Sequence, residues 1–476
     1  MIQVACSIVC MLSLCAQQPS ETQIDLVVVA KEAWREELTP FVEFKRARAG
    51  ISSCALLTIE SVESTGTAPA PADSAEALKR ALFQLWKEGK CDAVLLVGDS
   101  SVLPVRYMML DRNTEPAFDT AFYASDLYFG DLARGDGTFD DWNASRSDHH
   151  AQYFGEVHGE HHKSGPINFD GVSYTPEIAV GRWPARNVEE AVAIAAKSMR
   201  TETAWAAHAP AAQTGNAQTK SAPAKSALPA RHPALFVAAG GWIDNRKQIE
   251  ALARDENAPW QPRLFAWFAP ENAADEPTVR AALATKPRLV FHTGHGQPWG
   301  WEQCLNRETL ASNAGAEELP VIFSIGCSTA EIAPQPPYTA YVDVIGVRHK
   351  GTNAGEIFTT PPPPPAVIQP ADLDATSISE DSLRWKDCGA VAAIGCVTGS
   401  QPCAHTLLDG FVQAARASPG NSIGQWWMDA LRHYHHAEHL DSIKPSESWY
   451  PASIYFQGMK FVLLGDPTLR PLENAP

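Results

Sequence analysis

Two short apolar runs, RLVFHTGHG (288–296) and PVIFSIGCS (320–328), decide the fold class of this sequence. Each run is continuously apolar and ends in a glycine-containing turn, which is typical of a central strand buried on both faces of a parallel sheet. The chain between them suits a crossover with one helix, and a right-handed crossover makes the two strands parallel. Their carboxyl ends then share one edge of the sheet, where open α/β sheets bind ligands.

One reactive side chain follows each run. His295 and Cys327 are 32 positions apart, and the shared sheet edge predicts that imidazole and thiol lie close together. Cysteine attacks as a thiolate, and an adjacent imidazole can accept its proton. The backbone N–H groups of Gly296 and Cys327 are candidate donors to an oxyanion. From spacing alone, a buried cysteine and a capping histidine remain an equal alternative. His292 is expected to serve packing.

The rest of the chain repeats strand and helix patterns in two series. IDLVVVA (24–30), CALLTI (54–59) and DAVLLVGD (92–99) alternate with helical segments, which predicts a parallel sheet covered by helices. A second series of strand patterns begins at ALFVAAG (234–240). The predicted organisation is an N-terminal α/β subdomain over 24–205, a flexible low-complexity insert over 206–232, and a catalytic subdomain over 233–472 with an irregular, proline-rich insertion over 331–380.

Composition and charge narrow the classes of function. Apolar residues make up 45% of the 476 residues and charged residues 20%, which is a globular composition. The net charge of −17, from 38 basic and 55 acidic residues, argues against a nucleic-acid or anionic-membrane partner. After the first residues no stretch approaches the roughly 20 apolar residues of a membrane-spanning helix. Enzymes and binding proteins that act on small molecules or proteins remain.

The start of the chain predicts export. MIQVACSIVCMLSLCA is apolar and uncharged, which favours a secretory signal over residues 1–18, although the basic beginning of such signals is missing. Lipoprotein anchoring at Cys15 is a weaker hypothesis, because Leu14 stands where a small residue is usual. A short buried strand is the alternative. The seven later cysteines are odd in number and form no CxxC pair, so neither a disulfide framework nor a zinc site is predicted.

Several segments, taken in order, resemble the gingipain family of cysteine peptidases, which are relatives of caspases. Besides the two catalytic turns they are CDAVLLVGDSSVLP, ASDLYFGDL, PEIAVGRWPARNVEEA, GAVAAIGCVTGSQ and FVLLGDPTLRP. The resemblance covers roughly residues 24–472 and implies a caspase-like α/β parallel-sheet sandwich in two side-by-side subdomains. It implies an endopeptidase that needs no cofactor, acts on proteins or peptides, and forms a thioester acyl-enzyme.

Residue by residue, the resemblance implies Cys327 as the nucleophile, His295 as the general base and Glu177 as the acid that orients the imidazole. A surface acid at the start of a strand is the alternative for Glu177. The family cleaves after Arg or Lys through an acidic pocket with an aromatic wall. Here Glu189 and Glu190 fall near the position of the pocket acid but also fit a helix N-terminal turn, and GCVTGSQP lacks the expected tryptophan.

An acidic loop, GDGTFDDWN (135–143), resembles a segment that could hold calcium in relatives. Its candidate ligands carry the oxygen atoms that calcium prefers; they are Asp136, Asp140, Asp141 and Asn143. Because the regular Asp spacing of calcium loops is absent, a solvated acidic loop is an equal alternative. Three readings of the whole chain remain. The favoured one is an exported, monomeric cysteine endopeptidase. The second is a catalytically degenerate relative that serves as a surface binding or secretion-associated protein, and the third is a metallohydrolase built on the histidine clusters.

Overall fold

The computed structural model describes residues 23–472 apart from several internal segments. These segments are 65–68, 112–114, 118–119, 143–171, 208–230, 242, 255–257, 267–272, 374–375 and 444–448. The predicted signal segment with Cys15, the ligand candidate Asn143, and most of the insert predicted over 206–232 therefore lie outside the described residues.

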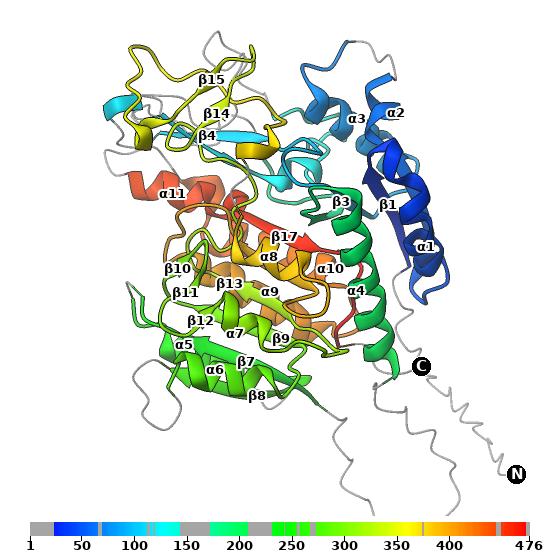
Figure 1. Ribbon diagram of the computed structural model, residues 1–476, viewed down its shortest axis with the longest axis vertical. Coiled ribbons are helices and arrows are strands. Elements are labelled where there is room, and N and C mark those ends of the chain that lie inside the picture. The colour runs from blue at the N-terminus through cyan, green and yellow to red at the C-terminus, as the bar shows by residue number, and fades with distance from the viewer. Residues whose placement is uncertain are drawn as a thin grey trace, which may run out of the picture.

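A ten-stranded sheet runs through both halves of the molecule in the order β2-β1-β3-β6-β17-β16-β13-β9-β7-β8. Its strands are β1 (Ile24–Ala30), β2 (Ile51–Thr58), β3 (Ala93–Val97), β6 (Ala179–Trp183), β7 (His232–Ala238), β8 (Trp260–Ala266), β9 (Leu289–Thr293), β13 (Val321–Ser324), β16 (Ala392–Cys396) and β17 (Phe461–Gly465). The strands of the N-terminal half, blue to green in Figure 1, meet those of the C-terminal half where β6 pairs with β17 through Arg182 and Leu464.

The strand directions decide which loops share an edge. β9, β13 and β16 are parallel to one another, as the two apolar runs predict. β17 is antiparallel to β16 and parallel to β6, so the two halves of the sheet run in opposite directions. The carboxyl ends of β9 and β13 therefore share their edge with the amino end of β6, and not with its carboxyl end.

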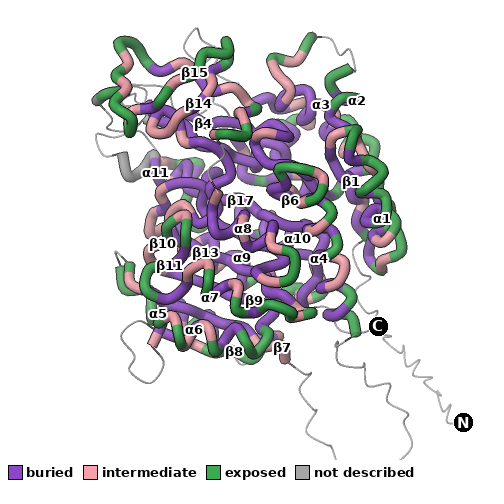
Figure 2. Tube along the Cα trace, viewed as in Figure 1, coloured by how far each residue is buried: buried purple, intermediate pink, exposed green. Residues whose placement is uncertain are grey.

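Helices cover both faces of the sheet, with buried inner faces and exposed outer faces (Figures 1 and 2). They are α1 (Arg35–Arg46), α2 (Ile59–Ser64), α3 (Ser74–Lys87), α4 (Val188–Ala207), α5 (Arg246–Ala253), α6 (Glu276–Leu283), α7 (Arg307–Ala311), α8 (Ile378–Arg384), α9 (Ala404–Ala417), α10 (Ile423–Ala437) and α11 (Trp449–Gln457). Caps fix their starts: Asp73 accepts from the Glu76 N–H at 2.9 Å before α3, as expected of an N-cap aspartate.

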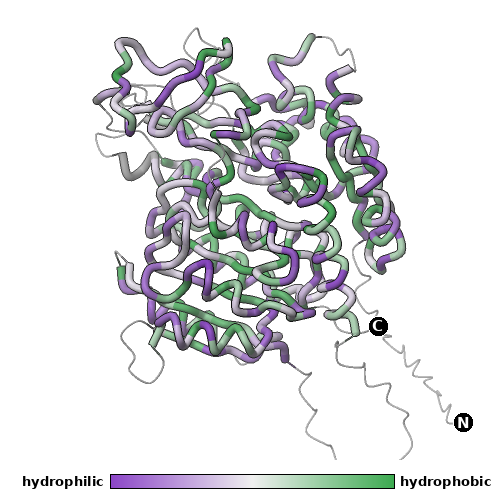
Figure 3. The backbone as a smooth tube through the Cα atoms, in the orientation of Figure 1, coloured by the Kyte–Doolittle hydropathy of each residue, from purple (hydrophilic) through white to green (hydrophobic). Residues whose placement is uncertain are grey.

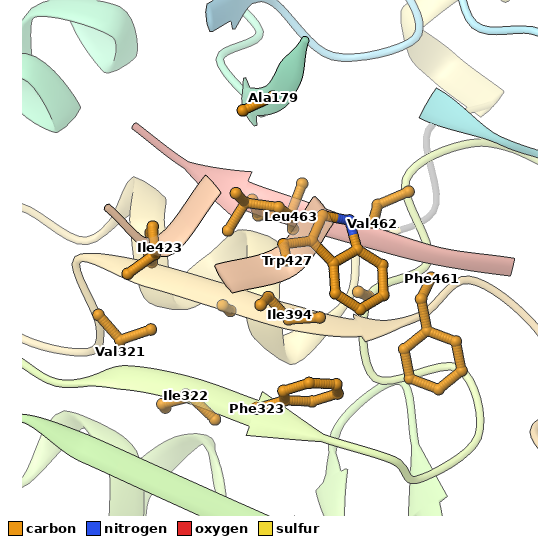
Figure 4. Packing of buried hydrophobic residues seen from close by; sticks show 14 of the residues in the cluster. Ala179, Val321, Ile322, Phe323, Ile394, Ile423, Trp427, Phe461, Val462 and Leu463 are labelled. Carbon is orange, nitrogen blue, oxygen red and sulfur yellow. The ribbon is translucent and has the colours of Figure 1, made fainter. Parts of the chain in front are cut away.

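The core of the C-terminal half is aromatic. Trp427 of α10 lies beside Leu463 of β17 and near Ile394 of β16 (Figure 4), and its ring centroid is 5.9 Å from that of Phe323 in β13. Along the strands the chain is hydrophobic, whereas the outer helical faces are hydrophilic (Figure 3). Burying apolar area at about 25 cal/mol per Å² makes this packing the main support of the strands that carry the site.

The insertion predicted over residues 331–380 is mainly irregular and carries a few short elements. It contains a short hairpin, β14 (Tyr341–Val342) with β15 (Arg348–His349), and ends in α8. Its backbone bonds to the N-terminal half: Gln369 N–H donates to Ser100 O at 2.8 Å, and Phe122 N–H in the hairpin β4–β5 (Tyr107–Asp111, Thr120–Ala124) donates to Pro336 O at 2.7 Å. Proline removes backbone donors, so the segment is irregular, but loops of the other half supply partners.

A buried ionic cluster ties the chain's last strand to the N-terminal half. The Lys45 ammonium of α1 lies 2.6 Å from the Asp466 carboxylate and 2.7 Å from that of Glu202 in α4, and the Lys45 side chain is fully buried. Asp466 also accepts from the Thr468 N–H at 2.9 Å, which shapes the turn after β17. Within the described part of the chain, no helix is both long and apolar enough to cross a membrane.

Candidate active site

The turn that carries His295 is locked against the end of β7. The His295 N–H donates to Gly240 O at 2.7 Å, and the Glu302 N–H donates to His295 O at 3.1 Å. Gly294 has a φ of +137°, and a Cβ there would lie 2.8 Å from Gly240 O. Only glycine tolerates both the backbone angle and the contact, so this residue sets the path of the chain into His295.

The turn that carries Cys327 is held by the loop after β16. The Cys327 sulfur accepts from the Ser400 N–H at 3.3 Å, and the Ser328 N–H donates to Thr398 O at 2.9 Å. Ser328 has a φ of +53°, an uncommon value for a residue with a side chain. The thiol is half-buried, and the Cys327 N–H makes no hydrogen bond to another described residue.

The two turns touch through their glycines. A Cβ on Gly296 would lie 2.7 Å from the Gly326 Cα, and a Cβ on Gly326 would lie 2.7 Å from the Gly296 Cα. His295 and Cys327 consequently line one small cavity of about 50 Å³. Its other described lining residues are Gly241, Ile243, Asn245, Thr293, Gly294, Ile325, Ser400, Gln401 and Pro402. The structure therefore brings the predicted thiol and imidazole to the same place.

His292 lies beneath both turns. It is fully buried, stacks on Trp301 with ring centroids 4.2 Å apart, and its Nδ1 is 2.8 Å from Ser324 Oγ. Ser324 Oγ in turn accepts from the Gly326 N–H at 3.2 Å. Burial, together with the neighbouring His295, lowers the pKa of His292 to about 3. A histidine that is neutral at ordinary pH and links both turns is scaffold, in agreement with the expectation of a packing role.

Glu177 stands two residues before β6, at the same sheet edge as the two turns. Its carboxylate accepts from the Leu132 and Ala133 N–H groups at 2.6 and 3.1 Å. Burial raises the pKa of Glu177. Four strand spacings separate β6 from β9 in the sheet order, which is about 19 Å at the usual spacing. Among the described residues no hydrogen bond joins Glu177 to His295, and its orienting role stays a prediction.

The cavity beside the dyad contains no carboxylate among its described lining residues. Glu190 instead donates its N–H to Asn187 Oδ1 at 2.9 Å and pairs with Arg186. With Glu189 it belongs to the first turn of α4, which follows the carboxyl end of β6 and so lies at the opposite sheet edge from Cys327. The helix-turn alternative therefore describes these two acids correctly, and they are not pocket acids.

Each described carboxylate of the acidic loop has a different hydrogen-bond or ionic partner. Asp136 accepts from the Thr138 N–H at 2.9 Å, Asp140 is buried and accepts from the Trp142 N–H at 2.9 Å, and Asp141 lies 3.1 Å from Arg134. In the part of the chain that the structure describes, no group of three or more His, Cys, Asp or Glu side chains is placed to hold a metal ion. Calcium binding with Asn143 stays a prediction.

Sequence reasoning missed two neighbours of the dyad, Asn245 and Ser400. Asn245 Nδ2 donates to Thr293 Oγ1 at 2.6 Å at the end of β9, and Ser400 contacts the thiol. The signal that could have found Asn245 is the strand pattern ALFVAAG followed by a second glycine. This pattern forms β7, which neighbours β9, so the turn after β7 lies beside the turn that carries His295.

An α/β sheet that presents a thiol and an imidazole in one cavity at its strand ends has the architecture of a cysteine peptidase. The crystal structure of the Arg-specific cysteine proteinase gingipain R is similar over 95% of this chain and 79% of that chain, with a TM-score of 0.56 and 15% sequence identity. The complex of the pro- and mature domains of RgpB from Porphyromonas gingivalis is similar over 94% and 79%, with a TM-score of 0.53 and 14% identity. These likenesses confirm the predicted caspase-like α/β fold.

The sequence model of Peptidase family C25 matches residues 19–472, and the chain belongs to this family. Comparison with curated proteins gives no match. Family membership makes the chain a cysteine-type peptidase whose substrates are proteins or peptides, as the sequence predicts.

Proposed function

We propose that Cys327 and His295 are the catalytic dyad of an exported cysteine endopeptidase. The observation that supports this proposal is the shared cavity, since His295 and Cys327 follow different strands and both line it beside the close approach of Gly296 and Gly326. Positioning of a nucleophile beside a general base is the arrangement that activates thiols in other cysteine enzymes.

In the proposed mechanism His295 takes the thiol proton and the Cys327 sulfur attacks the carbonyl carbon of the scissile peptide bond. The N–H groups of Gly296 and Cys327 hold the oxyanion of the tetrahedral intermediate; support comes from the Cys327 N–H, which has no acceptor among the described residues. The C–N bond then breaks, and the leaving amine takes the proton from His295. Water, deprotonated by His295, hydrolyses the thioester and releases the acid and the free thiol.

Glu177 is kept as the proposed orienting acid, with a test that separates its two possible roles. If Glu177 orients the imidazole, the Glu177→Gln enzyme should lose kcat with little change in its unfolding midpoint, because the variant favours the wrong tautomer of the histidine. If Glu177 only holds the loop at Leu132 and Ala133, the variant should unfold at a lower temperature and retain its kcat. Measuring kcat and the thermal unfolding midpoint of the same variant decides between them.

Export and a monomeric state are proposed as well. Export is supported by the uncharged apolar start of the sequence, and fractionation of expressing cells tests it: intact, unprocessed protein in the cytoplasm would refute it. Size-exclusion chromatography with light scattering tests the monomer.

The central experiment for the dyad compares peptide-library cleavage by the wild type and by Cys327→Ala. A matched control is Cys388→Ala, because Cys388 is also a half-buried free cysteine but does not line the cavity. The proposal expects cleavage to be lost in the first variant and kept in the second. Cleavage that survives Cys327→Ala would overturn it.

A further inference from the structure

A second and larger pocket adjoins the imidazole of the dyad. Its volume is about 650 Å³, and His295 lines it whereas Cys327 does not. The rest of its described wall comes from the chain that follows the histidine turn and from the start of α6. That chain forms three short strands, β10 (Gly296–Gln297), β11 (Gly300–Trp301) and β12 (Leu305–Asn306). A substrate held at the dyad can therefore extend past the imidazole into this pocket.

The chemistry of the dyad indicates which part of a substrate lies on this side. The residue whose carbonyl is attacked, P1, stays bound to the Cys327 sulfur as the acyl-enzyme. The residue after the scissile bond, P1′, leaves as an amine that takes its proton from the imidazole of His295. The amine must consequently lie against the imidazole when the bond breaks. A pocket lined by His295 and not by Cys327 is on the P1′ side of the bond.

The wall of this pocket combines an exposed indole with carboxylates. Trp299 is 59% exposed, and it is the one aromatic residue among the strongly exposed large hydrophobic residues in the described part of the chain. Glu276 and Glu302 also line the pocket, and no Lys or Arg is among its described lining residues. An indole face attracts a cation, and the methylene stem of a Lys or Arg covers apolar surface. The wall therefore suits a long cationic side chain.

Glu302 is the carboxylate that can receive the charge of such a side chain. Its N–H donates to His295 O at 3.1 Å, which fixes its backbone to the turn of the proposed general base. Its side chain is exposed and forms no ion pair with another described residue. Glu276, in contrast, lies 2.7 Å from Arg280 and accepts from Asn306 Nδ2 at 3.1 Å. Glu302 thus brings a negative charge to the pocket that no neighbouring cation offsets.

We propose that this pocket is the S1′ subsite and that it selects substrates with Arg or Lys at P1′ through Glu302 and Trp299. The inference rests on the proposed function, because it takes the leaving amine to be protonated by His295. Glu302 is exposed, so the preference is moderate and weakens as salt is added. Cleavage then releases fragments whose first residue is basic.

The test uses one peptide that the wild type cleaves, with P1 kept constant and P1′ either Arg or its neutral isostere citrulline. At low ionic strength kcat/KM should be about threefold or more higher for Arg, and mass spectrometry of the products confirms that the same bond is cut. Glu302→Gln should lower this Arg-to-citrulline ratio by about threefold. Trp299→Ala should lower kcat/KM for both peptides, because both stems lose apolar surface.

A matched control is Glu317→Gln, which removes the same charge from an exposed acid that does not line the pocket. This variant should keep the wild-type ratio. Because the ratio compares two peptides on one enzyme preparation, a loss of folded protein in a variant cancels. The ratio therefore reports recognition of charge and not stability.

Three outcomes overturn the inference. They are a wild-type Arg-to-citrulline ratio of one at P1′, a ratio that Glu302→Gln leaves unchanged, and a preference for Arg at P1 that Glu302→Gln removes, which would place the pocket on the other side of the bond. Failure of the proposed function is distinct. Cleavage that persists in Cys327→Ala refutes the dyad, whereas Cys327-dependent cleavage without a preference at P1′ refutes only the S1′ assignment.

Discussion

The contact between Gly296 and Gly326 makes a quantitative prediction about catalysis. In Gly326→Ala the new Cβ would start 2.7 Å from the Gly296 Cα and 2.9 Å from the Gly296 N, and both of these are backbone atoms. An ordinary contact begins at 3.4 Å, so the two turns must separate by about 0.7 Å. Gly326 does not have a positive φ, and the effect is therefore one of space alone. Misplacing reacting groups by about 1 Å can cost about 100-fold.

We therefore expect kcat of Gly326→Ala to fall about 10- to 100-fold, with a loss of unfolding free energy of about 1–3 kcal/mol from overpacking. Steady-state cleavage of a good peptide and urea unfolding measure the two effects. Gly420→Ala is the matched control, because a Cβ at Gly420 meets no atom within 4 Å. A Gly326→Ala enzyme with wild-type kcat would show that the turns do not need this approach, and the account of the dyad would be wrong in its geometry.

Three further predictions concern stability. Burial lowers the pKa of His292 to about 3, so below about pH 6.5 the unfolded chain binds a proton that the folded chain does not, and the free energy of unfolding decreases as the pH falls. His292→Asn should remove about 2 kcal/mol of the decrease between pH 7.5 and pH 5, measured by urea unfolding. A decrease of the same size in the variant would contradict this. Asp466→Asn should cost about 1.5–3 kcal/mol in the same assay, because the buried Lys45 loses one of its two carboxylate partners and keeps Glu202, and a cost under about 0.5 kcal/mol would argue against an essential pair. Calcium bound by residues 135–143 would raise the thermal midpoint above that in EDTA, and equal midpoints would refute the calcium prediction.

The placement of His295 and Cys327 at one cavity could be predicted because it depends only on local pattern and handedness. Two continuous apolar runs, each ending in glycine, predict parallel strands with a shared edge. The Gly296–Gly326 approach and the position of Asn245 beside Thr293 could not be predicted in this way. They depend on how closely two turns and the end of β7 pack, and residue spacing along the sequence does not determine such packing distances.

The position of Glu177 shows a second limit of the sequence. Its segment resembles that of the family, but its distance from His295 depends on the strand order, in which β17 and β16 lie between β6 and β13. The antiparallel β17 comes from the last part of the chain, and its insertion between the halves has no local signal. The insertion over 331–380 shows the same limit, because loops of the N-terminal half supply hydrogen-bond partners that its own sequence does not reveal.

The central claim is that His295 activates Cys327, and the rate of thiol alkylation tests it most directly. Iodoacetamide labelling at neutral pH, followed residue by residue with mass spectrometry, should modify Cys327 first, because burial raises the pKa of Cys403 to about 11 and those of Cys54 and Cys304 to about 12. His295→Ala should slow labelling of Cys327 by about tenfold or more, with the other cysteines unaffected. Equal labelling of the three half-buried thiols, Cys327, Cys388 and Cys403, or a Cys327 rate that does not change in His295→Ala, would contradict the account.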